Sequence, residues 1–385
     1  MDSDIVVIGA GPAGLAVAAA LIRGGLRPEV LERADAVGSS WRSHYERLHL
    51  HTVKSLSALP GLAFAAHLPR YVPRQGVVDY LAGYARHAGI APCFGTEVRS
   101  VAPAGAERWL VTAADGRAWR ARAVVVTTGA NNLPFQPRLD GADDFAGRVM
   151  HSRDYRSGAA FAGRRVLVVG MGNTGAEIAL DLAEHGVAVA LSVRSPVNIV
   201  LRDVLGRPTQ KTSMLLGRLP TALGDAVARL LRDLTVGDLG RYGLRRATTS
   251  PLHDLRVHGR TPVIDVGTLA RIRSGDIAVH PGIERLTAHG ARFVDGREAA
   301  FDTVILATGY RSGIAAIFAP TRVPVDEHGL PTAAIGQGEL AGTYFVGFDT
   351  RQPGGLLRTI GQQALTVAAA VQARIERPDR ERAAA

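Results

Sequence analysis

The hydrophobic pattern of this chain contains the same sequence of a β-branched run and an alanine-rich segment twice, 161 positions apart. Ile5 to Ile8 and Val166 to Val169 are runs of β-branched residues, and an alanine-rich segment follows each. Such runs are too short and too β-branched for helices, so they predict buried strands. The periodic segments after them predict helices, from about Pro12 to Arg23 and up to about Glu184.

Further strands complete each unit. Glu29 to Leu31 follows the first expected helix, and Val187 to Val193 follows the second. Two later runs, Ala123 to Gly129 and Asp302 to Gly309, come after segments with an antiparallel pattern and a polar turn. These antiparallel segments are residues 109–112, 119–122 and 292–295. Each later run would close one unit before the chain crosses to the other.

The end of the chain returns to the first unit. Gly342 to Phe348 predicts a returning strand, and residues from about Leu356 to Arg374 predict a helix over the first unit. A length of 385 residues also favours two domains. We therefore expect an α/β fold of two nested Rossmann-like dinucleotide-binding domains. The first would comprise residues 1–157 and 313–385, and the second residues 158–312.

The segment from about Val197 to Arg260 is longer than a minimal nucleotide-binding fold needs. Its stretch from Thr221 to Leu234 is apolar on one helical face. Three roles remain open at this point: covering the active site, packing in the core, and forming a homodimer.

Glycines follow the first strand in the pattern G-x-G-x-x-G. Gly9 permits a tight turn, Gly11 lets the backbone approach a pyrophosphate, and Gly14 lets the helix pack closely on the strand. Glu32 follows 18 residues after Gly14, where a carboxylate accepts hydrogen bonds from ribose hydroxyls. This unit fits an unphosphorylated ribose and predicts a site for FAD.

The second unit carries Gly170, Gly172 and Gly175, with Asn173 and Thr174 inside the motif. Its second strand is followed by Arg194 and Ser195 instead of an acid. A guanidinium can bind a 2′-phosphate that a carboxylate would repel, so this unit predicts a site for NADPH. The alternative is that Arg194 is an ordinary exposed arginine.

Composition excludes several classes of function. The net charge is +10, but the basic residues are spread along the chain, which argues against nucleic-acid binding. No apolar run approaches the roughly 20 residues that a membrane helix needs. The first residues also lack the basic start of a signal peptide, so we expect a cytoplasmic protein with no membrane partner.

Electrons from a reduced flavin need an acceptor. Cys93 is the single cysteine, so no disulfide or C-x-x-C pair forms within the chain. The 12 histidines lack the spacing of a metal or haem site, and no metal is expected. Dioxygen is the acceptor that remains.

Three segments resemble motifs of flavin-containing monooxygenases. Phe145 to Tyr155, FAGRVMHSRDY, resembles the signature F-x-G-x-x-x-H-x-x-x-(Y/F), just before the second glycine motif. Gly38 to Arg42 (GSSWR) and Leu306 to Tyr310 (LATGY) resemble two others. Tyr155 stands where Baeyer–Villiger enzymes usually carry tryptophan.

The resemblance is sharper to the plant YUCCA branch, the indole-3-pyruvate monooxygenases. The segments that resemble it are residues 70–85, 192–195 and 259–277. This resemblance implies an oxidoreductase that uses NADPH and FAD, activates dioxygen as a C4a-(hydro)peroxyflavin, and excludes water from it. It also suggests oxidative decarboxylation of an aromatic 2-oxo acid. Further cofactor-binding residues expected from these motifs are Arg33, Trp41, Thr128, Gly129, Thr308, Gly309 and Tyr310.

One departure concerns His51, which falls near the flavin-face asparagine of the family. The YUCCA branch is similar to this chain there, and His51 is our candidate catalytic residue. The alternative is a loop histidine bonded to backbone. Two other functions stay open: an N- or C-oxygenating tailoring enzyme of natural-product biosynthesis, and a peroxide-forming NADPH oxidase or flavin reductase.

Overall fold

The computed structural model describes residues 1–105, 108–319 and 321–377. Its first unit is built on a parallel sheet with the strand order β2-β1-β6-β21. These strands are β1 Ile5–Ile8, β2 Glu29–Leu31, β6 Ala123–Val126 and β21 Thr343–Phe345. All three neighbouring pairs run parallel, and β1, β6 and β21 are almost completely buried. The sheet is therefore covered on both faces, as parallel sheets generally are.

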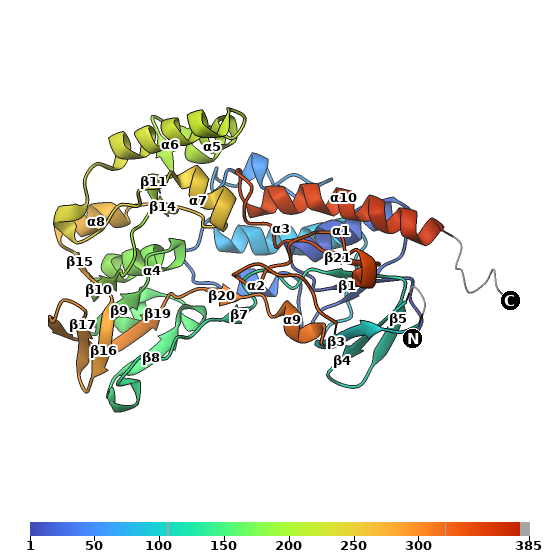
Figure 1. Ribbon diagram of the computed structural model, residues 1–385, viewed down its shortest axis with the longest axis horizontal. Helices are drawn as coiled ribbons and strands as arrows, with labels where there is room; N and C mark the ends of the chain where they lie inside the picture. The colour runs from blue at the N-terminus through green and yellow to red at the C-terminus, as the bar shows by residue number, and fades with distance from the viewer. Residues whose placement is uncertain (106–107, 320, 378–385) are drawn as a thin grey trace.

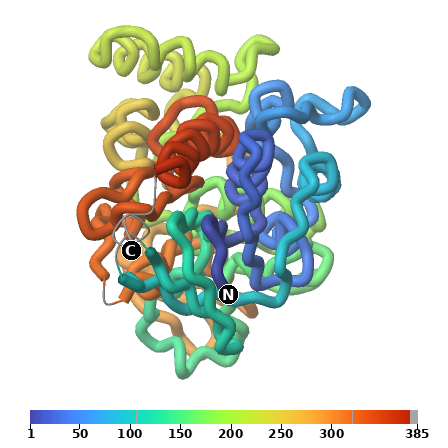
Figure 2. The backbone as a smooth tube through the Cα atoms, turned by 90° about the vertical axis from the view of Figure 1, so that its right-hand side faces the viewer, coloured from blue at the N-terminus to red at the C-terminus, as the bar shows by residue number. Residues whose placement is uncertain are grey.

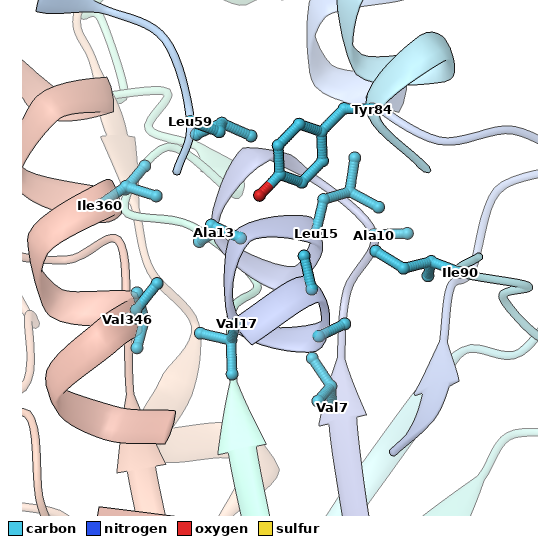
Figure 3. Packing of buried hydrophobic residues seen from close by; sticks show 14 of the residues in the cluster. Val7, Ala10, Ala13, Leu15, Val17, Leu59, Tyr84, Ile90, Val346 and Ile360 are labelled. Carbon is cyan, nitrogen blue, oxygen red and sulfur yellow. The ribbon is translucent and has the colours of Figure 1, made fainter. Parts of the chain in front are cut away.

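Alternate side chains of β1 enter two different cores. Ile5 and Val7 face a core formed with helices α1 (Pro12–Arg23), α3 (Arg74–His87) and α10 (Leu356–Glu376). Figure 3 shows Val7, Leu15, Val17, Val346 and Ile360 packed together there. On the opposite face, Val6 and Ile8 pack against the antiparallel sheet β3 (Val98–Pro103), β4 (Trp109–Ala113) and β5 (Ala118–Ala121).

The second unit repeats this arrangement around a five-stranded parallel sheet of order β15-β10-β9-β19-β8. Its strands are β8 Arg148–His151, β9 Arg165–Val169, β10 Ala188–Ser192, β15 Ile277–His280 and β19 Thr303–Leu306. Helices α4 (Asn173–Glu184) and α8 (Thr268–Ser274) join the core on one face. The antiparallel strands β16 (Ile283–Thr287), β17 (Gly290–Phe293) and β18 (Glu298–Ala300) cover the other.

The segment between β10 and α8 projects from the second unit. It contains β11 Ile199–Leu201, β12 Asp203–Val204, β13 Arg207–Pro208, α5 Thr209–Leu216, α6 Thr221–Val236, α7 Pro251–His258 and β14 Val263–Asp265. Helices α5 and α6 form the outer edge of the molecule in two views at right angles, at the top of Figures 1 and 2. They are thus the most peripheral helices of this unit.

A short antiparallel ribbon marks the crossing between the two units. β7 (Leu133–Pro134) pairs with β20 (Tyr310–Arg311), so the outgoing and returning chain run side by side. Figure 1 shows this ribbon between the two large sheets. The remaining short helices are α2 Ser39–Arg42, α9 Ile314–Ile317 and the 3-10 helices Lys54–Leu56, Ala142–Asp144, Ser152–Asp154, Gly158–Phe161, Gly240–Tyr242 and Gly338–Leu340.

The structure confirms the α/β fold with two dinucleotide-binding units and the returning strand β21. The expected strand 292–295 is wrong at its end: β17 stops at Phe293, because a turn closed by the Gly296 N–H on the Phe293 carbonyl reverses the chain.

β8 is the edge strand of the second sheet, whereas our boundary at residue 157 places it in the first domain. The assignment of residues 1–157 and 313–385 to one domain and 158–312 to the other stays a proposal, and residues 378–385 lie outside the described part. No helix among the described residues is long and apolar enough to cross a membrane.

Candidate cofactor and active site

A cavity of about 710 Å³ lies at the carboxyl ends of β1 and β6 in the first unit. Ligands of open parallel sheets bind at this edge, where the strand order changes direction. Of the residues predicted for the FAD site, the cavity wall contains Gly9, Gly11, Glu32, Arg33, Trp41, Thr128, Gly129 and Tyr310. Tertiary folding has therefore brought together residues that are up to 300 positions apart in sequence.

The three glycines of the first turn are required for different reasons. Gly9 has a φ of +107°, which side chains rarely adopt. A Cβ on Gly14 would lie 1.8 Å from the Gly9 carbonyl oxygen, so any side chain would push α1 away from β1. A Cβ on Gly11 would meet no atom within 4 Å. Gly11 is therefore not needed for packing, and its missing side chain leaves the cavity open.

Glu32 joins the end of β2 to this turn. Its carboxylate accepts hydrogen bonds from the N–H of Ala10 at 2.6 Å and from the N–H of Ala34 at 2.9 Å. Only 5 % of the residue is exposed, and it lines the cavity. The carboxylate is thus fixed in position next to the glycine turn, as the sequence predicts for a ribose-binding acid.

Aromatic and basic side chains line the other end of the cavity. Trp41 and His44 come from α2 and the segment after it, and Tyr310 comes from the crossing ribbon. Burial lowers the pKa of His44, and three arginines around it (Arg74, Arg153 and Arg156) lower it further, while Glu177 opposes the shift. His44 is therefore neutral at pH 7 in a positively charged surrounding.

The second glycine turn has the same geometry as the first. Gly170 has a φ of +100°, and a Cβ on Gly175 would lie 2.0 Å from the Gly170 carbonyl oxygen. A Cβ on Gly172 would meet no atom within 4 Å. Asn173 begins α4 and holds β14 over the turn: its side chain donates to the Pro262 carbonyl and accepts from the Ile264 N–H. Thr174 lies half-buried in the first turn of α4.

Arg194 and Ser195 lie exposed just beyond the carboxyl end of β10, close to this second turn in the sheet. The Arg194 side chain forms no ion pair with a described residue. Arg245 donates a hydrogen bond to the Arg194 carbonyl oxygen, which places a second guanidinium beside it. Two cations therefore stand near the place where the sequence predicts a 2′-phosphate.

Thr308 and Gly309 do not lie in the cavity wall. The Thr308 hydroxyl donates to the Phe135 carbonyl at 2.5 Å, and the Phe135 N–H donates to the Gly309 carbonyl at 2.9 Å. These two residues therefore fix the crossing ribbon, while Tyr310, the next residue, reaches the cavity.

His51 is bonded across the two units and not to backbone. Its Nε2 forms a hydrogen bond with the Glu177 carboxylate, whose side chain is 3 % exposed on α4. Burial, together with the charge of the Glu177 carboxylate, holds the pKa of Tyr45 well above its usual value. A buried carboxylate of the second unit thus organises the segment that carries His51.

The comparisons with known proteins agree with this geometry. Residues 2–318 match the model of a family described as flavin-binding monooxygenase-like. The chain is 41 % identical over 383 residues to indole-3-pyruvate monooxygenase YUCCA1 of Oryza sativa subsp. japonica, which covers 97 % of this chain and 93 % of that protein. The chain belongs to the flavin-binding monooxygenase-like family.

Two further members extend the comparison. Indole-3-pyruvate monooxygenase YUCCA6 of Arabidopsis thaliana is 40 % identical over 356 residues, covering 90 % of this chain and 85 % of that protein. A solved flavin-containing monooxygenase from Stenotrophomonas maltophilia superposes with a TM-score of 0.76 at 25 % identity, over 97 % of this chain and 99 % of that one. The protein is a flavin-dependent monooxygenase, and its cofactors are FAD and NADPH.

The motif that the family shares at Phe145 to Tyr155 has a structural role here. A Cβ on Gly147 would lie 2.6 Å from the Asp302 carbonyl oxygen, so β8 can approach β19 only without a side chain there. His151 is buried and bonds the Gly309 carbonyl at 3.1 Å. The Tyr155 hydroxyl donates to Asp181 on α4 at 2.5 Å. The motif therefore joins the second sheet to the crossing ribbon and to α4.

Sequence reasoning missed part of the cavity wall. His44, Arg153 and Asn132 gather there from three separate segments, and Gly347, Leu356 and Leu357 come from the returning part of the chain. Two of them had a sequence signal: His44 lies three residues after Trp41, and Arg153 lies inside the motif Phe145 to Tyr155. The other residues carry no local pattern, because long-range packing decides which loop residues face a cavity.

Replacing Gly11 tests the cavity as the FAD site. In Gly11→Val the free energy of unfolding without flavin should stay within about 0.5 kcal/mol, because a Cβ at this position would meet no protein atom within 4 Å. FAD affinity should fall by roughly tenfold or more, because the side chain enters the cavity. Flavin titration and denaturant unfolding measure the two effects. Gly83→Val on α3 is the control, because a Cβ there also meets no atom closer than 4.0 Å. Normal flavin content in Gly11→Val would contradict the assignment of the cavity to FAD.

Proposed function

We propose that this protein oxidatively decarboxylates an aromatic 2-oxo acid of the indole-3-pyruvate type, in the cytoplasm, with FAD, NADPH and dioxygen. The observation that carries the proposal is identity of about 40 % over nearly the whole chain to proteins named for that reaction. In chemical terms the acid R–CH₂–CO–COOH, dioxygen, NADPH and a proton give R–CH₂–COOH, carbon dioxide, water and NADP⁺.

Flavin, when bound, supplies the activation of dioxygen, and the chain supplies binding and orientation. FAD would lie in the first cavity, with the pyrophosphate at Gly11, a ribose at Glu32 and the flavin end near Trp41. NADPH would lie at the second turn, with Gly172 at the pyrophosphate and Arg194 at the 2′-phosphate. Both glycine positions are open in the structure, which fits these groups.

The positive surrounding of His44 supports an anionic substrate. Arg153 lines the cavity, and Arg74 and Arg156 lie near enough to affect the same histidine. The acidic side chains of the cavity wall are Glu32 and Glu97, after β2 and before β3, while Glu177, outside the wall, opposes the effect of the three arginines on His44. A carboxylate next to a ketone would be attracted to this end.

Helix α5 supports the exclusion of water from that end. Its Gln210 accepts a hydrogen bond from the Val53 N–H at 2.8 Å and donates to the Gly354 carbonyl at 2.5 Å. Gly354 lies two residues before Leu356, which lines the cavity. Of the three roles left open for segment 197–260, covering the active site therefore suits α5.

The peroxide-forming alternative differs from the proposal in its products. Indole-3-pyruvate and phenylpyruvate should each raise NADPH consumption and give the acid with one carbon fewer. With isotopic dioxygen, one labelled oxygen should appear in that acid, as mass spectrometry would show. Peroxide equal to all the NADPH consumed, whatever acid is added, would favour the oxidase. Turnover of amines or electron-rich rings alone would favour a tailoring enzyme.

Replacing Arg194 tests the NADPH site. A charge-assisted hydrogen bond contributes about 1.5 to 3 kcal/mol, so Arg194→Ala should lower the preference for NADPH over NADH by roughly 10- to 150-fold. Flavin reduction kinetics with both nucleotides measure the ratio. Arg202→Ala is the control, because Arg202 lies over the Tyr71 ring and beside Asp203. An unchanged ratio in Arg194→Ala would move the assignment to another cation, with Arg245 first.

We propose that Glu177 positions His51 for catalysis. Glu177→Gln should keep normal flavin content, since neither residue lines the FAD cavity. The acid formed per NADPH should fall about tenfold as in His51→Ala, with the double variant no worse than either. Product and peroxide assays measure this coupling. Glu184→Gln is the control: this carboxylate of α4 also bonds across the units, to Arg47, but further out. Additive losses in the double variant would contradict the pairing.

A further inference from the structure

Helix α6 presents its apolar residues to solvent instead of to the protein. Leu223, Leu230 and Leu234 are 52 %, 57 % and 73 % exposed. The residues of α6 that are buried are Gly224, Ala228, Arg232 and Val236. At about 100° per residue, the three leucines lie within roughly 40° of one another and nearly opposite Ala228 and Arg232. The helix is therefore amphipathic with its apolar side outward.

Hydrogen bonds and a close helix–helix contact hold the inward side of α6 against the protein. Arg232 is buried and donates to the Asn198 side chain and to the carbonyls of Ala247 and Thr249. A Cβ on Gly224 would lie 2.6 Å from the Leu216 carbonyl oxygen, so α6 lies close against α5. Rotating the leucines inward would break these contacts. The outward leucines therefore form an exposed apolar patch on the most peripheral helices of the unit (Figures 1 and 2).

The charges around the leucines indicate what covers them. From residue 209 to 236 the exposed charged residues are Lys211, Arg218 and Arg229, all basic, and none of them forms an ion pair with a described residue. The two acids of this stretch, Asp225 and Asp233, are less exposed and each is paired with arginine. Exposed leucines next to unpaired cations are typical of helices that lie on an anionic lipid surface.

We propose that α6 and the adjoining α5 dock this protein on an anionic membrane surface, with Leu223, Leu230 and Leu234 inserted and Lys211, Arg218 and Arg229 over the head groups. A second copy fits less well, because a twofold contact through this face would bring its three cations toward the same three cations of the partner. This docking differs from our expectation of no membrane partner, which was based on the absence of a spanning segment. It also leaves α5 in place beside the cavity.

The test uses the full-length flavin-loaded protein and vesicle flotation. The wild-type chain should float with vesicles of phosphatidylcholine and phosphatidylglycerol, and much less with phosphatidylcholine alone. The triple variant Leu223→Ser, Leu230→Ser, Leu234→Ser should lose about tenfold or more of this binding. Lys211→Gln, Arg218→Gln, Arg229→Gln should lose the preference for the anionic lipid. Val294→Ser with Leu365→Ser, two exposed apolar residues elsewhere, is the control and should bind as wild type.

Absence of wild-type binding to either vesicle would overturn the proposal without any variant. Analytical sedimentation of the same samples tests the alternative that a second copy of this chain covers the leucines. A wild-type dimer that the triple leucine variant converts to monomer, with no vesicle binding by either, would assign the face to a second copy. Flavin absorbance and thermal unfolding show whether each variant is folded.

Discussion

Close contact between a helix and the turn that precedes it is the constraint on which both nucleotide units depend. Gly14 approaches the Gly9 carbonyl and Gly175 approaches the Gly170 carbonyl more closely than any side chain would permit. Each helix can therefore begin directly at the carboxyl end of a buried strand, with its first N–H groups at that edge of the sheet. The open positions Gly11 and Gly172 leave room for a ligand at these same helix ends.

The second constraint is the crossing between the units. The β7–β20 ribbon brings the outgoing and returning chain together, and the bonds from Thr308 and His151 fix its ends. Because the ribbon follows the ends of β6 and β19, it places Tyr310 in the wall of the cavity of the first unit. The motif Phe145 to Tyr155 before β9 thus holds the two units in one arrangement, and its Arg153 lines the cavity.

Helix α4 has two roles as a result. Its first turn follows the second glycine motif, and its buried carboxylates Glu177 and Asp181 form hydrogen bonds with His51 and Tyr155. Buried carboxylates are costly unless they are bonded, so these contacts specify where the segment around His51 lies. The position of the segment around His51, in the first unit, is therefore set partly by the second unit.

The sequence by itself determined the two strand–turn–helix units, the later strand that closes each of them, and the strand that returns to the first unit. This was possible because a buried strand, a glycine turn and a helix are local patterns whose reasons lie within about 30 residues. The tertiary structure alone decided that β8 joins the second sheet, that Thr308 and Gly309 support the crossing, and that His51 meets Glu177. It also decided that the leucines of α6 face outward. An amphipathic pattern gives the two sides of a helix, but only its buried partners, here Arg232 with Asn198, determine which side is turned to the protein.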